Sequence, residues 1–339
     1  MVKWLKIGFS LFLAAILLFS LSACGSGKIS GTKKQQVQKV RVAEVTRSVF
    51  YTPLYVALAK GYFKEEGLDV QLTTTWGGDK TMTTLLSGGA DIALVGSETS
   101  IYVHKQQTSD PVINFAQLTA TDGTFLVSRK KISHFSWDML KGSDFLGQRK
   151  GGMPQMVGEY VLKKHHIDPH NDTKLIQNID FANIANAYAS GTGDFVQLFE
   201  PTASIMEKEG KGTIVASFGK ESGEVPYTTF MSKQSYLDKN EKTAEKFVRA
   251  LLKAGKWVQK TDPKVVAESV HPYFKDTEPD ILASSIERYR SQGSFSSDMI
   301  LTKKGWNTLQ DIMKEAGELE QKIDYDQLVN TSIVKNASK

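Results

Sequence analysis

One short sequence pattern occurs twice in this chain, about a hundred residues apart. Residues 87–95 read Ser-Gly-Gly-Ala-Asp-Ile-Ala-Leu-Val, and residues 190–198 read Ser-Gly-Thr-Gly-Asp-Phe-Val-Gln-Leu. In each copy a helical pattern ends at Ser-Gly, an Asp turns the chain, and a short apolar run leads to an acidic residue, Glu98 or Glu200. A repeat spaced at domain length does not indicate a solenoid. The pattern therefore predicts two similar α/β lobes with a cleft between them.

The first residues have the features of an export signal. Two lysines precede an apolar run at residues 11–19, and this run leads to Leu-Ser-Ala-Cys at residues 21–24. The run is shorter than a membrane-spanning helix, so we expect residues 1–23 to be removed. Leu-Ser-Ala-Cys also resembles the lipobox of bacterial lipoproteins, which implies that Cys24 is lipidated and anchors the protein to the outside of the cell membrane. A plain signal peptide with an incidental cysteine is the alternative.

Basic residues are concentrated at the start of the chain. The net charge is +5, but seven of the 42 Lys and Arg residues lie between residues 3 and 41, which leaves 35 basic against 37 acidic residues. A nucleic-acid-binding protein would carry its basic residues on a folded face, so we expect no nucleic-acid partner. Residues 24–39 are polar and are expected to form a flexible tether. Because Cys24 is the only cysteine, the body has no disulfide, thiolate metal site or cysteine nucleophile.

Hydrophobic periodicity predicts an α/β fold in which each lobe is a mixed sheet flanked by helices. The first lobe is expected to combine residues 40–122 and 228–327, and the second to span residues 123–227. The expected strands are residues 40–45, 70–74, 92–95, 112–118, 124–127, 175–178, 195–198, 214–216 and 228–231.

Four details of this assignment can be tested separately. Residues 112–118 and 124–127 are expected to form a strand pair, and residues 228–231 are expected to return the chain to the first lobe. Residues 239–317 have helical periodicity. Residues 328–339 are expected to be a frayed tail.

Seven side chains fall where an expected strand ends or a helix begins. Ligands bind at this rim in open α/β sheets, because helix N-termini offer unpaired N–H groups there. The candidate ligand-binding residues are Arg47, Tyr51, Trp76, Glu98, Asp122, Gln155 and Glu200. Repetition in both lobes favours the cleft for the two glutamates. Helix caps, turns and core aromatics are the alternative interpretations of the other five.

The sequence carries no motif for catalysis, a metal or a cofactor. Pro169 separates His170 from His165 and His166, so the three histidines do not share a helix face and are expected to be solvated. The Gly-Thr-Gly of the second repeat precedes a strand, whereas a dinucleotide fingerprint follows one. No phosphate loop, nucleophile elbow or nucleophile-base pair is present. We therefore expect a protein that is not an enzyme.

Several segments resemble the type II solute-binding proteins of bacterial ABC importers, in the group that binds nitrate, sulfonates, taurine and thiamine pyrimidine precursors. The matching segments are Phe-Tyr-Thr-Pro-Leu-Tyr-Val-Ala at residues 50–57, Gly-Tyr-Phe at 61–63, Glu-Gly-Leu at 66–68, Gly-Gly-Ala-Asp-Ile-Ala at 88–93, Gly-Asp at 193–194 and Phe-Glu-Pro at 199–201. The last has Phe199 where the family often has Trp. The resemblance covers residues 40–315.

The resemblance implies two lobes joined by crossing strands near residues 117–127 and 228–231, which close on a ligand and exclude water. It also implies a monomer that docks on a membrane permease driven by an ATPase. A tethered sensor domain that hands its ligand to a receptor fits the sequence equally well. Pyrimidine-forming enzymes of this fold carry a Cys-rich motif that the body lacks.

The candidate residues favour two different ligand classes. Arg47 and the helix N-termini favour an anion such as a sulfonate, taurine or nitrate. Glu98 and Glu200 oppose a bare anion, because a buried carboxylate needs a hydrogen-bond donor. Together with Tyr51 and Trp76, the glutamates suit a flat N–H-bearing heterocycle such as an aminopyrimidine, which is our expectation.

Overall fold

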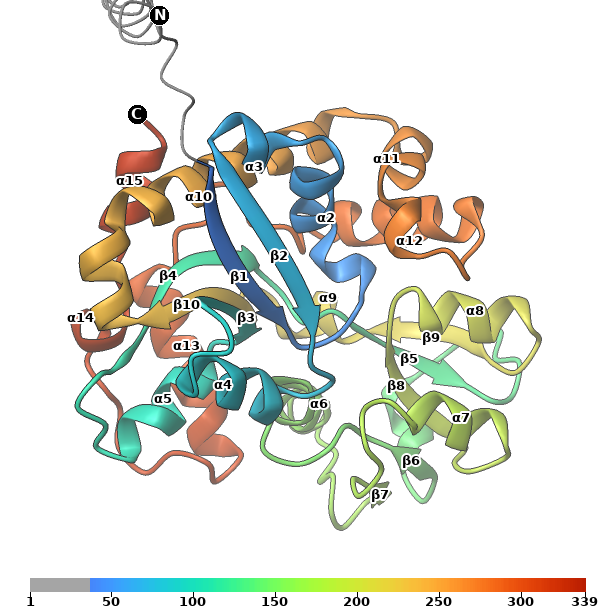
Figure 1. Cartoon of the computed structure of the whole chain (residues 1–339). Helices are drawn as coiled ribbons and strands as arrows, with labels where there is room; N and C mark the ends of the chain where they lie inside the picture. Colours follow the sequence, from blue (N-terminus) through green and yellow to red (C-terminus); the bar gives the residue numbers. More distant parts are fainter. Residues whose placement is uncertain (1–36) are drawn as a thin grey trace, which may run out of the picture. The chain divides into compact units, whose positions relative to one another are not determined.

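The computed structural model describes residues 37–339, which contain two five-stranded sheets (Figure 1). The expected signal peptide, Cys24 and the tether up to residue 36 lie outside the described residues. Strand β1 begins at Gln38, two residues before the expected start of the first strand at residue 40. Among residues 37–339, no helix combines the length and apolar character needed to cross a membrane.

The first sheet has the strand order β2-β1-β3-β10-β4. Strands β1, β2 and β3 are parallel, whereas β10 lies antiparallel to both β3 and β4. The chain therefore leaves this sheet after β4 and returns to it with β10, as the sequence predicted, and β10 lies between β3 and β4. The strands are β1 (Gln38–Glu44), β2 (Leu68–Thr74), β3 (Ile92–Gly96), β4 (Val112–Thr119) and β10 (Thr228–Lys233).

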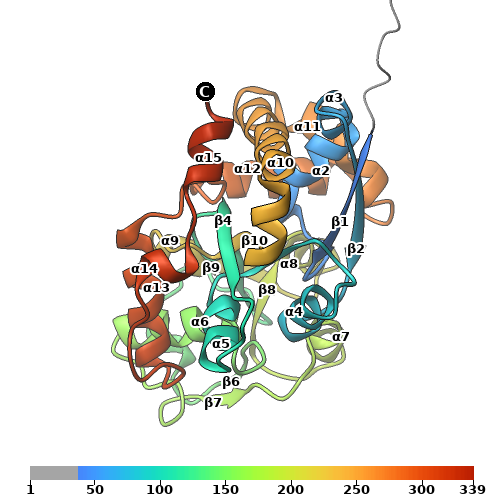
Figure 2. The same ribbon diagram turned by 60° about the vertical axis from the view of Figure 1, so that its left-hand side comes forward.

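Helices cover both faces of the first sheet, and the side chains of β3 show why. Ile92 and Leu94 belong to the main hydrophobic core, whereas Ala93 and Val95 belong to a smaller core with residues of α4 and α5. This alternation is the period of two that a strand buried on both faces requires. Helices α2 and α10 lie on one side of the sheet and α4 and α5 on the other (Figures 1 and 2).

The helices of the first lobe come from both ends of the described chain. Those before β4 are η1 (Val49–Tyr51), α2 (Thr52–Ala59), α3 (Tyr62–Glu65), α4 (Gly78–Leu86) and α5 (Glu98–Lys105). Those after β10 are α10 (Gln234–Lys260), α11 (Pro263–Val270), η3 (His271–Tyr273), α12 (Pro279–Ser291), α13 (Lys303–Glu315), α14 (Tyr325–Leu328) and α15 (Ser332–Ala337).

The second sheet has the order β7-β6-β8-β5-β9 and takes all its strands from one continuous segment. The strands are β5 (Thr124–Ser128), β6 (Asp144–Leu146), β7 (Lys174–Ile176), β8 (Phe195–Phe199) and β9 (Thr213–Ser217). The helices are η2 (Trp137–Leu140), α6 (Met153–Lys164), α7 (Ile184–Ala189), α8 (Thr202–Lys208) and α9 (Phe218–Ser222). Strand β6 has only three residues and no alternating pattern, and it was not predicted.

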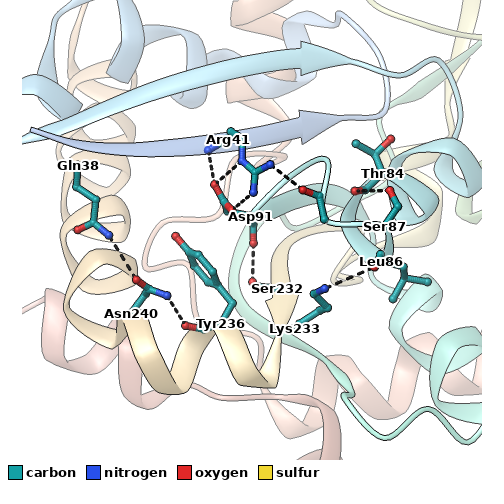
Figure 3. A network of polar contacts seen from close by, with 11 residues as sticks. Gln38, Arg41, Thr84, Leu86, Ser87, Asp91, Ser232, Lys233, Tyr236 and Asn240 are labelled. Atoms are coloured by element: carbon teal, nitrogen blue, oxygen red, sulfur yellow. Dashed lines mark hydrogen bonds and ion pairs between the residues drawn. The ribbon is translucent and has the colours of Figure 1, made fainter.

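The repeated pattern occupies equivalent places in the two sheets. In each copy the Asp backbone N–H donates to a carbonyl of the neighbouring parallel strand: Asp91 to Arg41 of β1, and Asp194 to Asp144 of β6. The Asp91 carboxylate also accepts a hydrogen bond from the backbone N–H of Arg41, and the Asp194 carboxylate accepts one from the backbone N–H of Asp144. Figure 3 shows the first copy, where the Arg41 guanidinium also binds the Asp91 carboxylate and the carbonyl of Gly88.

Two expectations from the sequence are wrong. Strands β4 and β5 do not pair, because residues 120–123 carry the chain from the first sheet to the second. The end of the chain is not frayed: α15 buries Ile333 and Val334 completely. In addition, Val329 forms a parallel bridge with Asn114 of β4. An exposed tail cannot make such contacts, so the last residues belong to the first lobe.

Candidate ligand-binding cleft

A cavity of about 450 Å³ lies between the two sheets, with walls from both lobes. A second compartment of about 320 Å³ adjoins it and shares four lining residues: Thr46, Gln148, Phe181 and Phe199. We call them the inner and the outer compartment. Both volumes lie in or near the range of small-molecule sites. Tyr51 and Glu98 line the inner compartment, whereas Arg47, Trp76 and Glu200 line the outer one.

Glu98 is the central polar group of the inner compartment. It is the first residue of α5, and its side chain folds back over Gly96, where a Cβ atom would stand 2.2 Å from Oε2. Any larger residue at position 96 would force the Glu98 carboxyl group to move. Oε1 accepts a hydrogen bond from the backbone N–H of Met153, the first residue of α6 in the other lobe, at 3.2 Å.

The other oxygen of Glu98 has no partner. Glu98 is 3% exposed, and Oε2 makes no hydrogen bond with any residue in the described range 37–339. Burial raises the pKa of Glu98 to about 8, and hydrogen bonds from its own N–H and that of Met153 only partly oppose this effect. A buried, unpaired carboxyl oxygen facing a cavity is a site for a hydrogen-bond donor.

Three tyrosines surround Glu98. Tyr51 and Tyr227 are buried, and Tyr102 lies on the same face of α5, one turn after Glu98. Burial, and to a smaller extent the nearby Glu98 charge, raises the pKa of each phenol above its ordinary value. All three hydroxyls therefore stay protonated at neutral pH. The compartment combines one carboxyl group with aromatic walls, which Phe181 and Phe199 complete.

Asp122 and Gln155 are buried outside both compartments. Asp122 Oδ1 accepts hydrogen bonds from Thr124, and burial raises the Asp122 pKa to about 6. The Tyr227 hydroxyl is close enough to lower that pKa, but the two groups do not reach hydrogen-bond geometry. Gln155 accepts from the Gly151 N–H at 2.9 Å and donates to Glu159 at 2.7 Å. It therefore fixes the turn that precedes α6.

Glu200 differs from Glu98 because both its oxygens are bonded. Oε2 accepts from the Ser204 N–H at 3.0 Å and Oε1 from the Ser204 hydroxyl at 2.8 Å. Arg288 of α12 completes the set, with Nε 3.3 Å from Oε1. Burial raises the Glu200 pKa, and the Arg288 charge opposes this. Glu200 therefore acts as a helix cap and a link between the lobes, with no free oxygen for a ligand.

Arg47 and Trp76 border the outer compartment. Arg47 is already bound: Nε lies 2.9 Å from Glu44 Oε1, and Nη2 donates to the Thr74 hydroxyl at 3.0 Å. Its guanidinium lies over the rings of Tyr55 and Tyr273. Trp76 is 47% exposed and has a φ of 58°, which is uncommon for a large side chain. Neither residue reaches the inner compartment.

An ion pair that the sequence did not predict spans the opening of the inner compartment. Arg149 of the second lobe lies 2.9 Å from Asp79 of α4 and 3.5 Å from Asp180. Arg149 and Asp79 both line the inner compartment, and both are about half exposed. The sequence did not predict three further residues of the inner compartment, because they come from separate segments: Tyr102, Arg149 and Tyr227. Only the predicted helix start at Pro154 indicated this region.

Solved structures show which fold this chain has. The alkanesulfonate-binding protein SsuA from Xanthomonas axonopodis pv. citri, bound to MOPS, is 15% identical with a TM-score of 0.70, over 87% of this chain and 98% of that chain. The periplasmic nitrate-binding protein NrtA from Synechocystis PCC 6803 is 17% identical with a TM-score of 0.69, over 89% of each chain. The chain therefore has the two-lobed periplasmic-binding-protein fold, as predicted.

The chain belongs to the NMT1/THI5-like family, whose model matches residues 49–264. It is also 62% identical over 338 residues to a protein of Bacillus subtilis (strain 168) named "Putative binding protein YtlA", with 100% of this chain and 99% of the relative covered. Together these matches confirm the resemblance to solute-binding proteins that the sequence motifs indicated.

Proposed function

We propose that this protein is an extracytoplasmic solute-binding lipoprotein, held at the membrane through Cys24, that delivers a small organic ligand to an ABC importer. The family, the binding-protein fold and a cleft with walls from both lobes support this proposal. The leader sequence supports the anchor. Binding does not require catalysis, and the body has no cysteine for the chemistry of the pyrimidine-forming relatives.

The position of Glu98 argues against a simple anionic ligand. The N-terminus of a helix is an anion-binding site, because its N–H groups are unpaired and the helix dipole favours negative charge there. In this cleft the Met153 N–H of α6 is already bonded to Glu98 Oε1. The protein's own carboxyl group thus occupies the place where a sulfonate or nitrate would bind, and in its ionised form it would repel one.

The unpaired Oε2 of Glu98 is the observation that carries our choice of ligand. In the ionised form of Glu98 this oxygen requires a donor, and the aromatic walls suit a flat ring, so we propose an N–H-bearing heterocycle of the aminopyrimidine type. Size supports an organic ligand as well, because nitrate has four atoms and would leave most of a 450 Å³ cavity to water. Because the two solved relatives bind alkanesulfonates and nitrate by name, these anions are the alternative ligands.

Thermal unfolding with a ligand panel tests this proposal. The chain from Gly27 onward retains the whole compact unit 37–339. A ligand at a hundred times its dissociation constant should stabilise it by about 2.7 kcal/mol, which raises the midpoint by several degrees. We expect this shift with aminopyrimidines and not with taurine, alkanesulfonates or nitrate. A shift with the anions alone would overturn the heterocycle proposal while retaining the binding function.

A matched pair of variants tests whether a stabilising ligand binds in the cleft. Glu98→Gln should lose most of the shift, because an amide presents a different donor and acceptor pattern at Oε2. Glu245→Gln is the control: Glu245 is also a buried carboxyl group, but it lies on α10 and binds Lys242 and Asn336. It should keep the full shift.

A further inference from the structure

Glu98 is the buried acidic group of the inner compartment, and no buried basic group from residues 37–339 balances it. Within that described range, the basic side chains that line the compartment are Arg149 and Lys150, and both are exposed at its opening. Arg149 is committed to two carboxylates, Asp79 and Asp180. When Glu98 is ionised, therefore, no side chain in the described part of the chain forms an ion pair with it.

The walls around Glu98 are of the kind that attract positive charge. Tyr51, Tyr102 and Tyr227 are all near enough to Glu98 to feel its charge, and Phe181 and Phe199 also line the compartment. The face of an aromatic ring is negative and binds cations, with a larger gain when water is excluded. A cation in this compartment would therefore be attracted both by the Glu98 carboxylate and by the faces of the aromatic rings.

We propose that the ligand is bound as an organic cation, a positively charged N-heterocycle whose charged ring donates to Glu98 Oε2 and lies against the three tyrosines. This inference rests on the proposed function and makes the ligand class narrower. A neutral heterocycle can bind only the protonated form of Glu98 without leaving a buried charge unpaired, whereas a cation supplies a counter-ion for the ionised form. The cost of an unpaired buried charge favours the cation.

Binding of a cation should release a proton from Glu98. Its pKa of about 8 in the ligand-free protein means that the carboxyl group is mostly protonated at pH 7. The cation binds the ionised form, so the proton leaves Glu98 for the buffer. The other titratable groups facing the compartment are Asp79, Arg149 and Lys150 at the opening and the phenols of Tyr51, Tyr102 and Tyr227. Near pH 7 the phenols stay protonated, because burial raises the pKa of each one.

Three small probe ligands of similar shape separate the effect of ligand charge on affinity from the effect of ligand shape. The first is 4-aminopyrimidine, which is neutral at pH 7; the second is 4-aminopyridine, which is a cation there; the third is 1-methyl-4-aminopyridinium, whose charge does not depend on pH. Titration calorimetry with the chain from Gly27 onward should show that the two cations bind at least about tenfold more tightly than the neutral probe at pH 7.

Proton release provides an independent measurement. With 1-methyl-4-aminopyridinium, the heat of binding should differ between buffers of different ionisation enthalpy, because a proton passes to the buffer. The affinity should rise about tenfold per pH unit below the Glu98 pKa of about 8 and become constant above it. Glu98→Gln should abolish both the proton release and the pH dependence, and Glu245→Gln should keep both. A melting curve for each variant verifies that it is folded.

The outcomes separate this inference from the proposed function. Equal or tighter binding of 4-aminopyrimidine, or binding of the permanent cation without proton release, would overturn the cation inference and leave the heterocycle proposal standing. Binding of alkanesulfonates with no binding of any of the three probes would overturn both. Retained preference for cations in Glu98→Gln would also contradict the inference, because Glu98 would then not be the group that selects them.

Discussion

Glu98 and Glu200 end the two copies of one sequence pattern, but the two carboxyl groups have opposite surroundings. Glu200 is bonded at both oxygens, by Ser204 and Arg288. Glu98 is bonded at one oxygen and open to a cavity at the other. The repeat therefore specifies the backbone, a strand followed by a turn and a helix, whereas the role of the acid depends on what the rest of the fold places beside it.

The aspartates of the same repeat show a similar difference. Asp91 binds both the backbone and the guanidinium of Arg41 (Figure 3). Asp194 binds the Asp144 backbone, and the arginine of that region, Arg129, binds carbonyl groups instead. Equivalent positions in the two lobes thus share their backbone hydrogen bonds but not their charge partners. Four predictions test this comparison.

The largest difference should appear in the pH dependence of stability of Glu98→Gln. The pKa of Glu98 is raised from 4.5 to about 8 on folding, so the protonated form stabilises the protein below pH 4.5 and this stabilisation is lost as pH rises through 8. The variant has no such group. Relative to wild type, it should gain free energy of unfolding on the order of 4 kcal/mol between about pH 5 and about pH 9.

Urea unfolding of both ligand-free proteins at the two pH values measures this gain. Other buried acids with raised pKa values, such as Glu44 and Asp122, are the same in both proteins and cancel. A gain that does not depend on pH would show that Glu98 does not titrate in this range.

Glu200→Ala should destabilise the protein by about 3 kcal/mol, because it removes a buried carboxylate and leaves Arg288 and Ser204 without their partner. The affinity of the folded protein for a cleft ligand should change far less than in Glu98→Gln. Urea unfolding and titration calorimetry measure the two effects. If Glu200→Ala weakens binding as much as Glu98→Gln does, the two acids are functionally equivalent after all.

Asp91→Ala should cost about 1.5 kcal/mol of stability and Asp194→Ala about 0.5 kcal/mol. The first variant loses a charged partner as well as a backbone hydrogen bond, and the second loses only a backbone hydrogen bond at an exposed position. Denaturation curves of the two variants, measured side by side, give the difference. Equal losses would mean that the Arg41 ion pair contributes nothing.

Arg149→Ala should have the smallest effect, an increase of about two- to threefold in the rate of ligand dissociation. The Arg149–Asp79 pair spans the opening of the inner compartment, but both side chains are about half exposed and screened by water and salt. Stopped-flow measurements of the rate of ligand dissociation at low and high salt can detect this increase. The effect should shrink at high salt, and an effect that persists would indicate a contact with the ligand itself.

The sequence predicted most of the fold because the strands show clear apolar runs and the helices have clear ends. Strand β6 was missed since three residues, Asp-Phe-Leu, carry no periodicity. The pairing of β4 with β5 was wrong because neighbouring strands usually pair, and nothing in residues 120–123 indicates a passage between lobes. The buried end of α15 was missed because six residues are too few to show an amphipathic pattern.

The candidate site was only partly predictable for a physical reason. Sequence position indicates which residues lie at the rim of a sheet, and Tyr51 and Glu98 do meet in one cavity. It does not show which rim residues are already bonded, as Gln155 and Glu200 are, or that Asp122 is bonded at Oδ1 only and lies outside the cavity. Sequence position also does not show which side chains of the other lobe line the cavity. The bond from Met153 to Glu98 joins residues 55 positions apart and could only be seen in the fold.

The place of β10 between β3 and β4 has a consequence for the time course of folding. Strands β3 and β4 cannot be joined until residues 228–233 are available, and these follow every residue of the second sheet. The second lobe can therefore form from one continuous stretch before the first lobe has strand β10, which joins β3 to β4. During synthesis from the N-terminus, the edges of β3 and β4 stay unpaired until β10 is available. In that interval they can bind chaperones or aggregate.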